Sequence, residues 1–193
     1  MKSLFVAIYF LAMVVQILIR APLSQRRKSE KISTRRITSQ ENLLLALLFA
    51  GMLLLPLIYS ATNWLDFANY TLPAWAGWLG VIVMLGALFI FWRSHADLGL
   101  NWSPSLEIRE KHTLITNGIY GTIRHPMYAS QWLWSIAQIL LIQNWVAGLI
   151  GLAIFAPFYL LRVQAEERLM LDTFGEEYQA YMQRTGGVLP KIR

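Results

Sequence analysis

Five long apolar runs limit how this chain can fold. They cover residues 3–19, 43–60, 75–92, 127–142 and 145–161. At about 1.5 Å per residue in a helix, runs of this length approach the roughly 30 Å thickness of a bilayer's hydrocarbon core. A segment in lipid must satisfy its own backbone polar groups, so each run predicts a helix. We therefore expect an all-α, polytopic membrane protein with five transmembrane helices, forming a single integral-membrane domain over residues 1–193.

The composition agrees with a membrane protein. Hydrophobic residues make up 56% of the 193 residues and charged residues only 15%, and the mean hydropathy is +0.44. A soluble domain carries more charge and fewer apolar residues. The chain contains no cysteine, which excludes disulfides, thiolate metal sites and a cysteine nucleophile.

The positive charges predict the orientation in the membrane. The net charge is +6, and seven of the 17 Lys and Arg residues lie in or beside one loop. They are Arg20, Arg26, Arg27, Lys28, Lys31, Arg35 and Arg36. A basic loop between two apolar runs is typical of a cytoplasmic segment that faces anionic lipids, so we expect membrane lipids and no nucleic acid as partners. The loop 61–74 has no Lys or Arg, which places it outside. These loops predict an outside N-terminus and a cytoplasmic C-terminus.

Two polar stretches should meet on the cytoplasmic side. The segment 93–124 and the tail from residue 162 onward are the longest charged parts after the basic loop. The last two apolar runs are separated only by Gln143 and Asn144, and so short a connection predicts an antiparallel helical hairpin. The hairpin brings the two polar stretches to the same membrane depth, so we expect the catalytic part at about 93–193. The residues predicted to become neighbours are Arg124, His125 and Tyr128 with Arg162, Glu166 and Glu167.

The start of the hairpin is the first candidate site. Pro126 fits the first turn of a helix, where its missing N–H costs nothing and the freed donors face a ligand. Arg124 and Tyr128 alone would also be typical interfacial anchors of a membrane helix.

Arg162 and Glu166 are four residues apart and share a helix face, so they form either a simple surface ion pair or a ligand-binding pair. An arginine in such a pair is suited to gripping a carboxylate through two parallel hydrogen bonds. His112 and His125 show no metal-ligand spacing, so we expect no metal.

The motifs in this region resemble those of the isoprenylcysteine carboxyl methyltransferase family, in particular its small prokaryotic members. The resemblance covers roughly the C-terminal half of the chain. Its motifs are His112-Thr113-Leu114-Ile115, Asn117-Gly118-Ile119-Tyr120, Arg124-His125-Pro126-Met127-Tyr128, Glu166-Glu167 and Phe174-Gly175-Glu176-Glu177-Tyr178. One departure is Ala129-Ser130, where family members commonly have a small hydrophobic residue followed by glycine.

The resemblance implies S-adenosylmethionine as methyl donor, bound in a cytoplasm-facing pocket between the hairpin and the tail. It implies Arg162 and Glu166 as catalytic residues. The cofactor-binding residues that it implies are His112, Thr113, Leu114, Ile115, Tyr120, His125, Pro126, Met127, Tyr128 and Glu166.

The expected reaction is methyl-ester formation on the carboxylate of a prenylated cysteine or a similar lipophilic acid. A carboxylate is already a nucleophile at neutral pH and needs no general base. Methylation of a phospholipid amine is the alternative; it requires a base, for which Glu166, Glu167 and His125 are candidates. A membrane reductase that uses NADPH and a non-enzymatic membrane scaffold are further alternatives. A lipophilic substrate would keep its tail in the bilayer while its head reaches the pocket.

Overall fold

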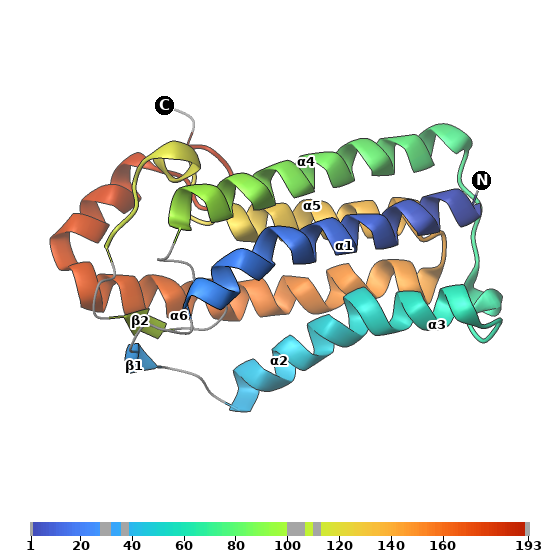
Figure 1. The fold of residues 1–193 in the computed structure, drawn as a ribbon, viewed down its shortest axis with the longest axis horizontal. Coiled ribbons are helices and arrows are strands. Elements are labelled where there is room, and N and C mark those ends of the chain that lie inside the picture. Colours follow the sequence, from blue (N-terminus) through green and yellow to red (C-terminus); the bar gives the residue numbers. More distant parts are fainter. Residues whose placement is uncertain (1, 28–31, 36–38, 100–106, 110–112, 192–193) are drawn as a thin grey trace.

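The computed structural model describes residues 2–27, 32–35, 39–99, 107–109 and 113–191, and the side chains within 2–22, 42–99 and 113–191. The helices lie side by side along one long axis (Figure 1). They are α1 (Lys2–Arg27), α2 (Ser39–Phe49), α3 (Leu55–Ala61), α4 (Ala74–Leu98), α5 (Pro126–Leu141) and α6 (Trp145–Arg184). Short 3₁₀ turns lie at Asp66–Ala68 and Gly118–Gly121.

The prediction of a helical membrane protein is confirmed. Four stretches of helix are long and apolar enough to cross a membrane: Lys2–Pro22, Asn42–Ala61, Ala74–Leu98 and Trp145–Arg184. The apolar run at 127–142 forms α5, which has 16 residues and is therefore about 24 Å long. Helix α5 is therefore shorter than each of these four stretches.

One small β-ribbon departs from the all-α expectation. Strands β1 (Ile32–Arg35) and β2 (Glu107–Arg109) pair antiparallel. β1 lies in the basic segment, which has no apolar periodicity, and its partner is far away in the sequence. Neither strand alone could be recognised, because the ribbon depends on that distant pairing. Of the seven basic residues in or beside this loop, Arg20 is the one whose side chain is described.

The second apolar run is interrupted by a π turn at Ala50–Leu54, between α2 and α3. Pro56 lies in the first turn of α3. Proline has no N–H, so the carbonyl four residues earlier, that of Met52, loses its usual donor. The Tyr9 hydroxyl of α1 donates to this carbonyl at 2.5 Å. The Gly51 carbonyl accepts from Nε2 of Gln138 on α5 at 3.0 Å. Neighbouring helices thus supply hydrogen-bond donors to the carbonyls of Gly51 and Met52 in this irregular part of the helix.

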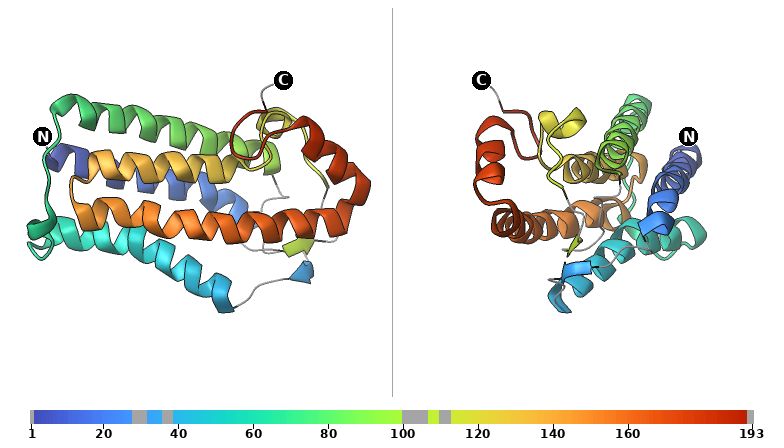
Figure 2. Two further views of the ribbon diagram at one scale, coloured as in Figure 1. Left: turned by 180° about the vertical axis from the view of Figure 1, so that it is seen from behind. Right: turned by 60° about the vertical axis from the view of Figure 1, so that its left-hand side comes forward.

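Helix α5 is the centre of the bundle. It packs against α4, α6 and α1, and Figure 2 shows it enclosed among them. Trp134, Ala137 and Leu141 on α5 are buried in one core with Phe5 and Tyr9 of α1. Because α5 has so many helical neighbours, the residues at its first turn are held in a fixed position.

The predicted hairpin between α5 and α6 is present. Asn144 caps α6, and its side-chain oxygen accepts from the N–H groups of Val146 at 3.0 Å and Ala147 at 2.9 Å. A Cβ at Gly148 would lie 2.4 Å from the Ile142 carbonyl, and one at Gly151 would lie 2.5 Å from Oε1 of Gln138. These glycines therefore allow the close contact that the tight hairpin requires.

Candidate active site

The loop that leads into α5 is fixed to the end of α4. Asp97 on α4 forms an ion pair with Arg93 at 2.8 Å and accepts a hydrogen bond from the N–H of Ile119 at 2.8 Å. Gly118 has φ of +58°, and a Cβ there would lie 2.2 Å from the Asp97 carboxylate. Only glycine fits this close approach. The contact sets the path of the chain before the first turn of α5.

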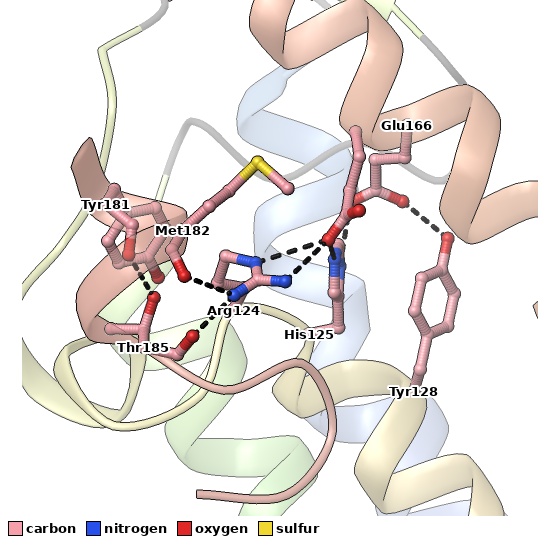
Figure 3. Close-up of polar contacts among 8 residues, drawn as sticks. Arg124, His125, Tyr128, Glu166, Tyr181, Met182 and Thr185 are labelled. Carbon is pink, nitrogen blue, oxygen red and sulfur yellow. Dashed lines mark hydrogen bonds and ion pairs between the residues drawn. The ribbon is translucent and has the colours of Figure 1, made fainter. Parts of the chain in front are cut away.

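A chain of hydrogen bonds links α5 to α6. Arg162 on α6 donates from Nε to the Tyr128 hydroxyl at 3.0 Å. The Tyr128 hydroxyl donates in turn to Glu166 at 2.5 Å. The Tyr128 hydroxyl thus bridges Arg162 and Glu166, and Figure 3 shows its bond to Glu166. This arrangement fixes a guanidinium and a carboxylate next to each other.

Arg124 joins three segments. Its Nη2 lies 2.9 Å from Oε1 of Glu167 on α6, and its Nε lies 3.2 Å from the same atom. Its Nη1 donates to the carbonyl of Thr185 at 2.5 Å and to that of Met182 at 3.3 Å. Figure 3 shows these contacts around one guanidinium. Arg124 therefore binds the tail as well as α6, which goes beyond the role of an interfacial anchor.

His125 lies between the two carboxylates of α6. Its Nε2 is 3.0 Å from Oε1 of Glu167 and its Nδ1 is 3.7 Å from Oε1 of Glu166, and its side chain is 3% exposed. Burial lowers the pKa of His125, but the hydrogen bonds and charges of Glu166 and Glu167 outweigh it and raise the pKa to about 9. At neutral pH His125 is therefore protonated. It donates to Glu167 and forms an ion pair with Glu166.

The tail folds back over this cluster. Helix α6 breaks at Gly175, which has φ of +51° and ψ of −125°. The chain then returns, and the N–H groups of Arg124 and His125 donate to the carbonyls of Gly186 at 2.9 Å and Gly187 at 3.1 Å. Tyr181 donates from its hydroxyl to the Tyr120 carbonyl at 2.6 Å. The tail thus closes one side of the site.

A cavity of about 520 Å³ opens onto these residues. Its polar end contains the candidate site residues that the sequence analysis singled out, apart from His112, which lies outside the described residues. They are Thr113, Leu114, Ile115, Tyr120, His125, Pro126, Met127, Tyr128, Arg162 and Glu166. The structure therefore brings together ten residues from a loop, α5 and α6 around one space.

The cavity is also lined by residues that the sequence analysis did not assign to the site. Tyr178 and Tyr181 from the tail line it, as do Leu169 and Met170 from α6. On the other side, α1 and α2 contribute a mostly apolar wall that includes Gln16 and Arg20. Gln16 inside the first apolar run and Arg20 just after it could have predicted this wall, since polar residues at membrane depth usually face a cavity.

Within the described ranges, no group of three or more His, Asp or Glu side chains is arranged to hold a metal ion. The carboxylates of Glu166 and Glu167 instead accept hydrogen bonds from Tyr128, Arg124 and His125.

Part of the chain is similar to known proteins of one family. Residues 78–172 match the model of the isoprenylcysteine carboxyl methyltransferase (ICMT) family. A protein-S-isoprenylcysteine O-methyltransferase of Mus musculus is 34% identical over 98 residues, which cover 51% of this chain and 35% of the mouse protein. The enzyme of the same name from Dictyostelium discoideum is 28% identical over 148 residues, or 75% of this chain and 61% of the relative.

A solved structure is also similar. The eukaryotic intramembrane Ras methyltransferase ICMT superposes with a TM-score of 0.51 and 25% sequence identity, covering 81% of this chain and 54% of that one. The chain thus spans between about a third and three fifths of the length of these relatives. The matched region contains α5, its preceding loop and the Arg162–Glu166 pair. Residues 78–172 of this chain are thus similar in sequence to the isoprenylcysteine carboxyl methyltransferase family, and the fold is similar to that of a solved member.

Proposed function

We propose that this protein is an S-adenosylmethionine-dependent methyltransferase that forms a methyl ester on the carboxylate of a prenylated cysteine or a similar lipophilic acid. One observation carries the proposal: a single cavity joins the polar cluster of Arg162, Tyr128 and Glu166 to an apolar wall formed by α1 and α2. A polar reaction centre continuous with an apolar space suits an acceptor with a charged head and a long hydrocarbon tail.

The chain crosses the membrane five times in this proposal, with the N-terminus outside and the C-terminus in the cytoplasm. Helix α5 begins at the end of the bundle where the tail lies and ends at the opposite end, so it runs antiparallel to α4 and α6 (Figure 1). The N- and C-termini lie at opposite ends of the bundle, as an odd number of crossings requires. The strand β1, from the basic segment, lies at the same end as the tail. The active site then faces the cytoplasm.

The residues around the cavity fit the methyl donor. Glu166 presents a carboxylate for an amino or hydroxyl group, while Tyr120 and Tyr178 provide aromatic faces for a ring or a sulfonium. The segment Thr113–Ile115 lines the same part of the site. We assign donor binding to these residues, to His125–Tyr128 and to His112. S-adenosylmethionine supplies an electrophilic methyl group when it is bound there.

The protein's part in the reaction is to position and desolvate the acceptor. The Nε hydrogen bond to Tyr128 fixes the plane of the Arg162 guanidinium, which can then hold a carboxylate in line with the methyl group. Protonated His125 and Tyr128 keep Glu166 ionised and oriented. Closing the tail over the site excludes water from the carboxylate, which strengthens its nucleophilicity. No proton has to be removed from the acceptor.

The class of reaction is tested by ligand binding in detergent. Purified protein is incubated with radiolabelled S-adenosylmethionine or with NADPH, and binding is measured with unlabelled competitor. We expect saturable binding of S-adenosylmethionine, competed by S-adenosylhomocysteine, and none of NADPH. Binding of NADPH alone would contradict the proposal and favour a reductase. Transfer of label to phosphatidylethanolamine, with none to a farnesylated cysteine, would favour an amine N-methyltransferase.

A further inference from the structure

Gln138 on α5 is fully buried, and its amide is engaged on both sides within the bundle. Its Oε1 accepts from the Tyr9 hydroxyl at 3.0 Å. Its Nε2 donates to the carbonyl of Gly51 at 3.0 Å and to that of Ala147 at 2.7 Å. An amide at membrane depth is costly unless it is paired in this way. Gln138 is therefore a structural residue that joins neighbouring helices.

A second glutamine of the same helix, Gln131, faces the cavity instead. It lies about two turns nearer the active site and is only partly buried. Its Nε2 donates to Sδ of Met52 at 3.0 Å, and a thioether is a weak acceptor. Within the part of the chain whose side chains are described, its Oε1 accepts no hydrogen bond. The side chain thus keeps a strong acceptor and a second N–H for a molecule in the cavity.

Gln16 on α1 lies at about the same depth as Gln131. Tyr9 on α1 and Gln138 on α5 are in contact. Gln16 follows Tyr9 by seven residues, and Gln131 precedes Gln138 by seven. The two helices run antiparallel (Figure 1), so seven residues, or about 10.5 Å, lead toward the same end of the bundle on each. Both glutamines line the cavity, which therefore has a polar level in a mostly apolar wall.

This polar level lies close to the reaction centre. In the proposed reaction Arg162 holds the acceptor carboxylate, beside the Tyr128 hydroxyl. Gln131 follows Tyr128 by three residues, so it lies on the same side of α5 and about 4.5 Å further into the bundle. An amide attached to the carbon next to the carboxylate would lie at this level. The hydrocarbon tail would continue past it along the wall formed by α1 and α2.

We propose that Gln131 is a specificity-determining residue that selects, among lipophilic carboxylates, those with an amide group on the carbon next to the carboxylate. The inference rests on the proposed methyltransferase function and narrows its acceptor class. The side chain of Gln131 can accept from the N–H of that amide or donate to its carbonyl, so the two groups are complementary. An acid without the amide would cover Gln131 with hydrocarbon and leave its oxygen without a donor, which disfavours binding.

The test compares two acceptors that share a carboxylate, a thioether and a farnesyl chain. N-acetyl-S-farnesylcysteine has the amide, and 3-(farnesylthio)propionic acid lacks it. Methyl-ester formation is measured with wild type in detergent and labelled S-adenosylmethionine. We expect the KM of the amide-free acid to be about tenfold higher, as the loss of one or two hydrogen bonds predicts. Equal KM values for the two acceptors would overturn the inference.

A variant assigns this preference to one side chain. Gln131→Met keeps the approximate size of the side chain and removes its amide, in surroundings that already include Met52. We expect the KM of N-acetyl-S-farnesylcysteine to rise about tenfold, while the KM of the amide-free acid does not rise and the Kd of the donor is unchanged. Gln179→Met changes an exposed residue of α6 outside the cavity lining, and it should behave as wild type.

Two results with the variant would also overturn the inference. One is a ratio of the two KM values that is the same in Gln131→Met as in wild type. The other is an equal rise in both KM values, since a purely structural role would affect the two acceptors alike. Failure of the proposed function itself looks different, because wild type would then form no ester with either acceptor.

Discussion

Arg124 and Glu167 are 43 residues apart in sequence, yet their side chains form a partly buried ion pair with 2.9 Å between Nη2 and Oε1. Their side chains are 12% and 24% exposed. The same guanidinium binds the Thr185 and Met182 carbonyls. Arg124, in the loop that precedes α5, thus connects α6 to the tail, and the shape of the site depends on this connection.

Removing that connection should loosen the tail. Replacement of Arg124 by Gln removes the charged donor of two carbonyls and leaves Glu167 with His125 alone, which we expect to cost about 2–3 kcal/mol. Thermal unfolding in detergent should show a lower Tm, and limited proteolysis should cut beyond Gly175 sooner than in wild type. Arg168→Gln is the matched control. An unchanged Tm with an intact tail would show that the pair contributes little.

The Tyr128 hydroxyl should matter for turnover more than for folding. Tyr128→Phe removes the group that joins Arg162 to Glu166 while keeping the ring, so the guanidinium loses its fixed orientation. We expect kcat for ester formation to fall roughly 10- to 100-fold. Tyr159→Phe, a partly buried tyrosine whose ring centre is 5.6 Å from that of Tyr128, is the control. Equal kcat values in the two variants would contradict this role for Tyr128.

Stability should depend on pH through His125. Its pKa is raised from 6.5 to about 9 in the folded protein by Glu166 and Glu167. The folded state therefore binds the proton more tightly, so this contribution is fully present below pH 6.5 and is lost as pH rises through about 9. The size is about 3 kcal/mol.

Thermal unfolding of wild type and His125→Gln between pH 6 and pH 10 measures this contribution. The wild-type Tm should fall more steeply between pH 7 and pH 9 than that of the variant, which lacks the titrating group. Parallel curves for the two proteins would show that His125 is not held protonated by the two glutamates.

Gly175 should be required for the turn of the tail. Its φ of +51° and ψ of −125° disfavour any residue with a Cβ, so Gly175→Ala should destabilise the closed tail by about 1–2 kcal/mol. We expect weaker donor binding, measured as a higher Kd for S-adenosylmethionine. Gly187→Ala is a suitable control, because a Cβ there meets open space and φ is not positive. Donor binding that is equally strong in both variants would argue against this role for the turn.

Much of this arrangement follows from local patterns in the sequence. Apolar runs predict the helices, and the two-residue link at Gln143 and Asn144 predicts the hairpin. That hairpin was enough to predict that His125 and Tyr128 would meet Glu166 and Glu167, and the distances confirm it. The helices and the hairpin can be predicted because each depends on a short stretch of sequence.

Other features depend on pairings between distant residues. The missing N–H of Pro56 leaves the Met52 carbonyl to accept from Tyr9 on α1, and no local pattern in the sequence predicts that partner. Arg124 and His125 contact Gly186 and Gly187 through backbone atoms, so the residue types in the sequence could not predict these contacts. Arg20 was read as part of a basic loop, because its place in the cavity wall depends on how α1 packs.

The most direct test of the account is methyl transfer from labelled S-adenosylmethionine to a short farnesylated cysteine in detergent, with product measured as base-labile methyl ester. Wild type should form the ester. Arg162→Ala should lose roughly 100-fold or more in kcat/KM while still binding the donor. Wild type that forms no ester, or Arg162→Ala that forms it as fast as wild type, would contradict the central claim that Arg162 holds a lipophilic carboxylate for methylation.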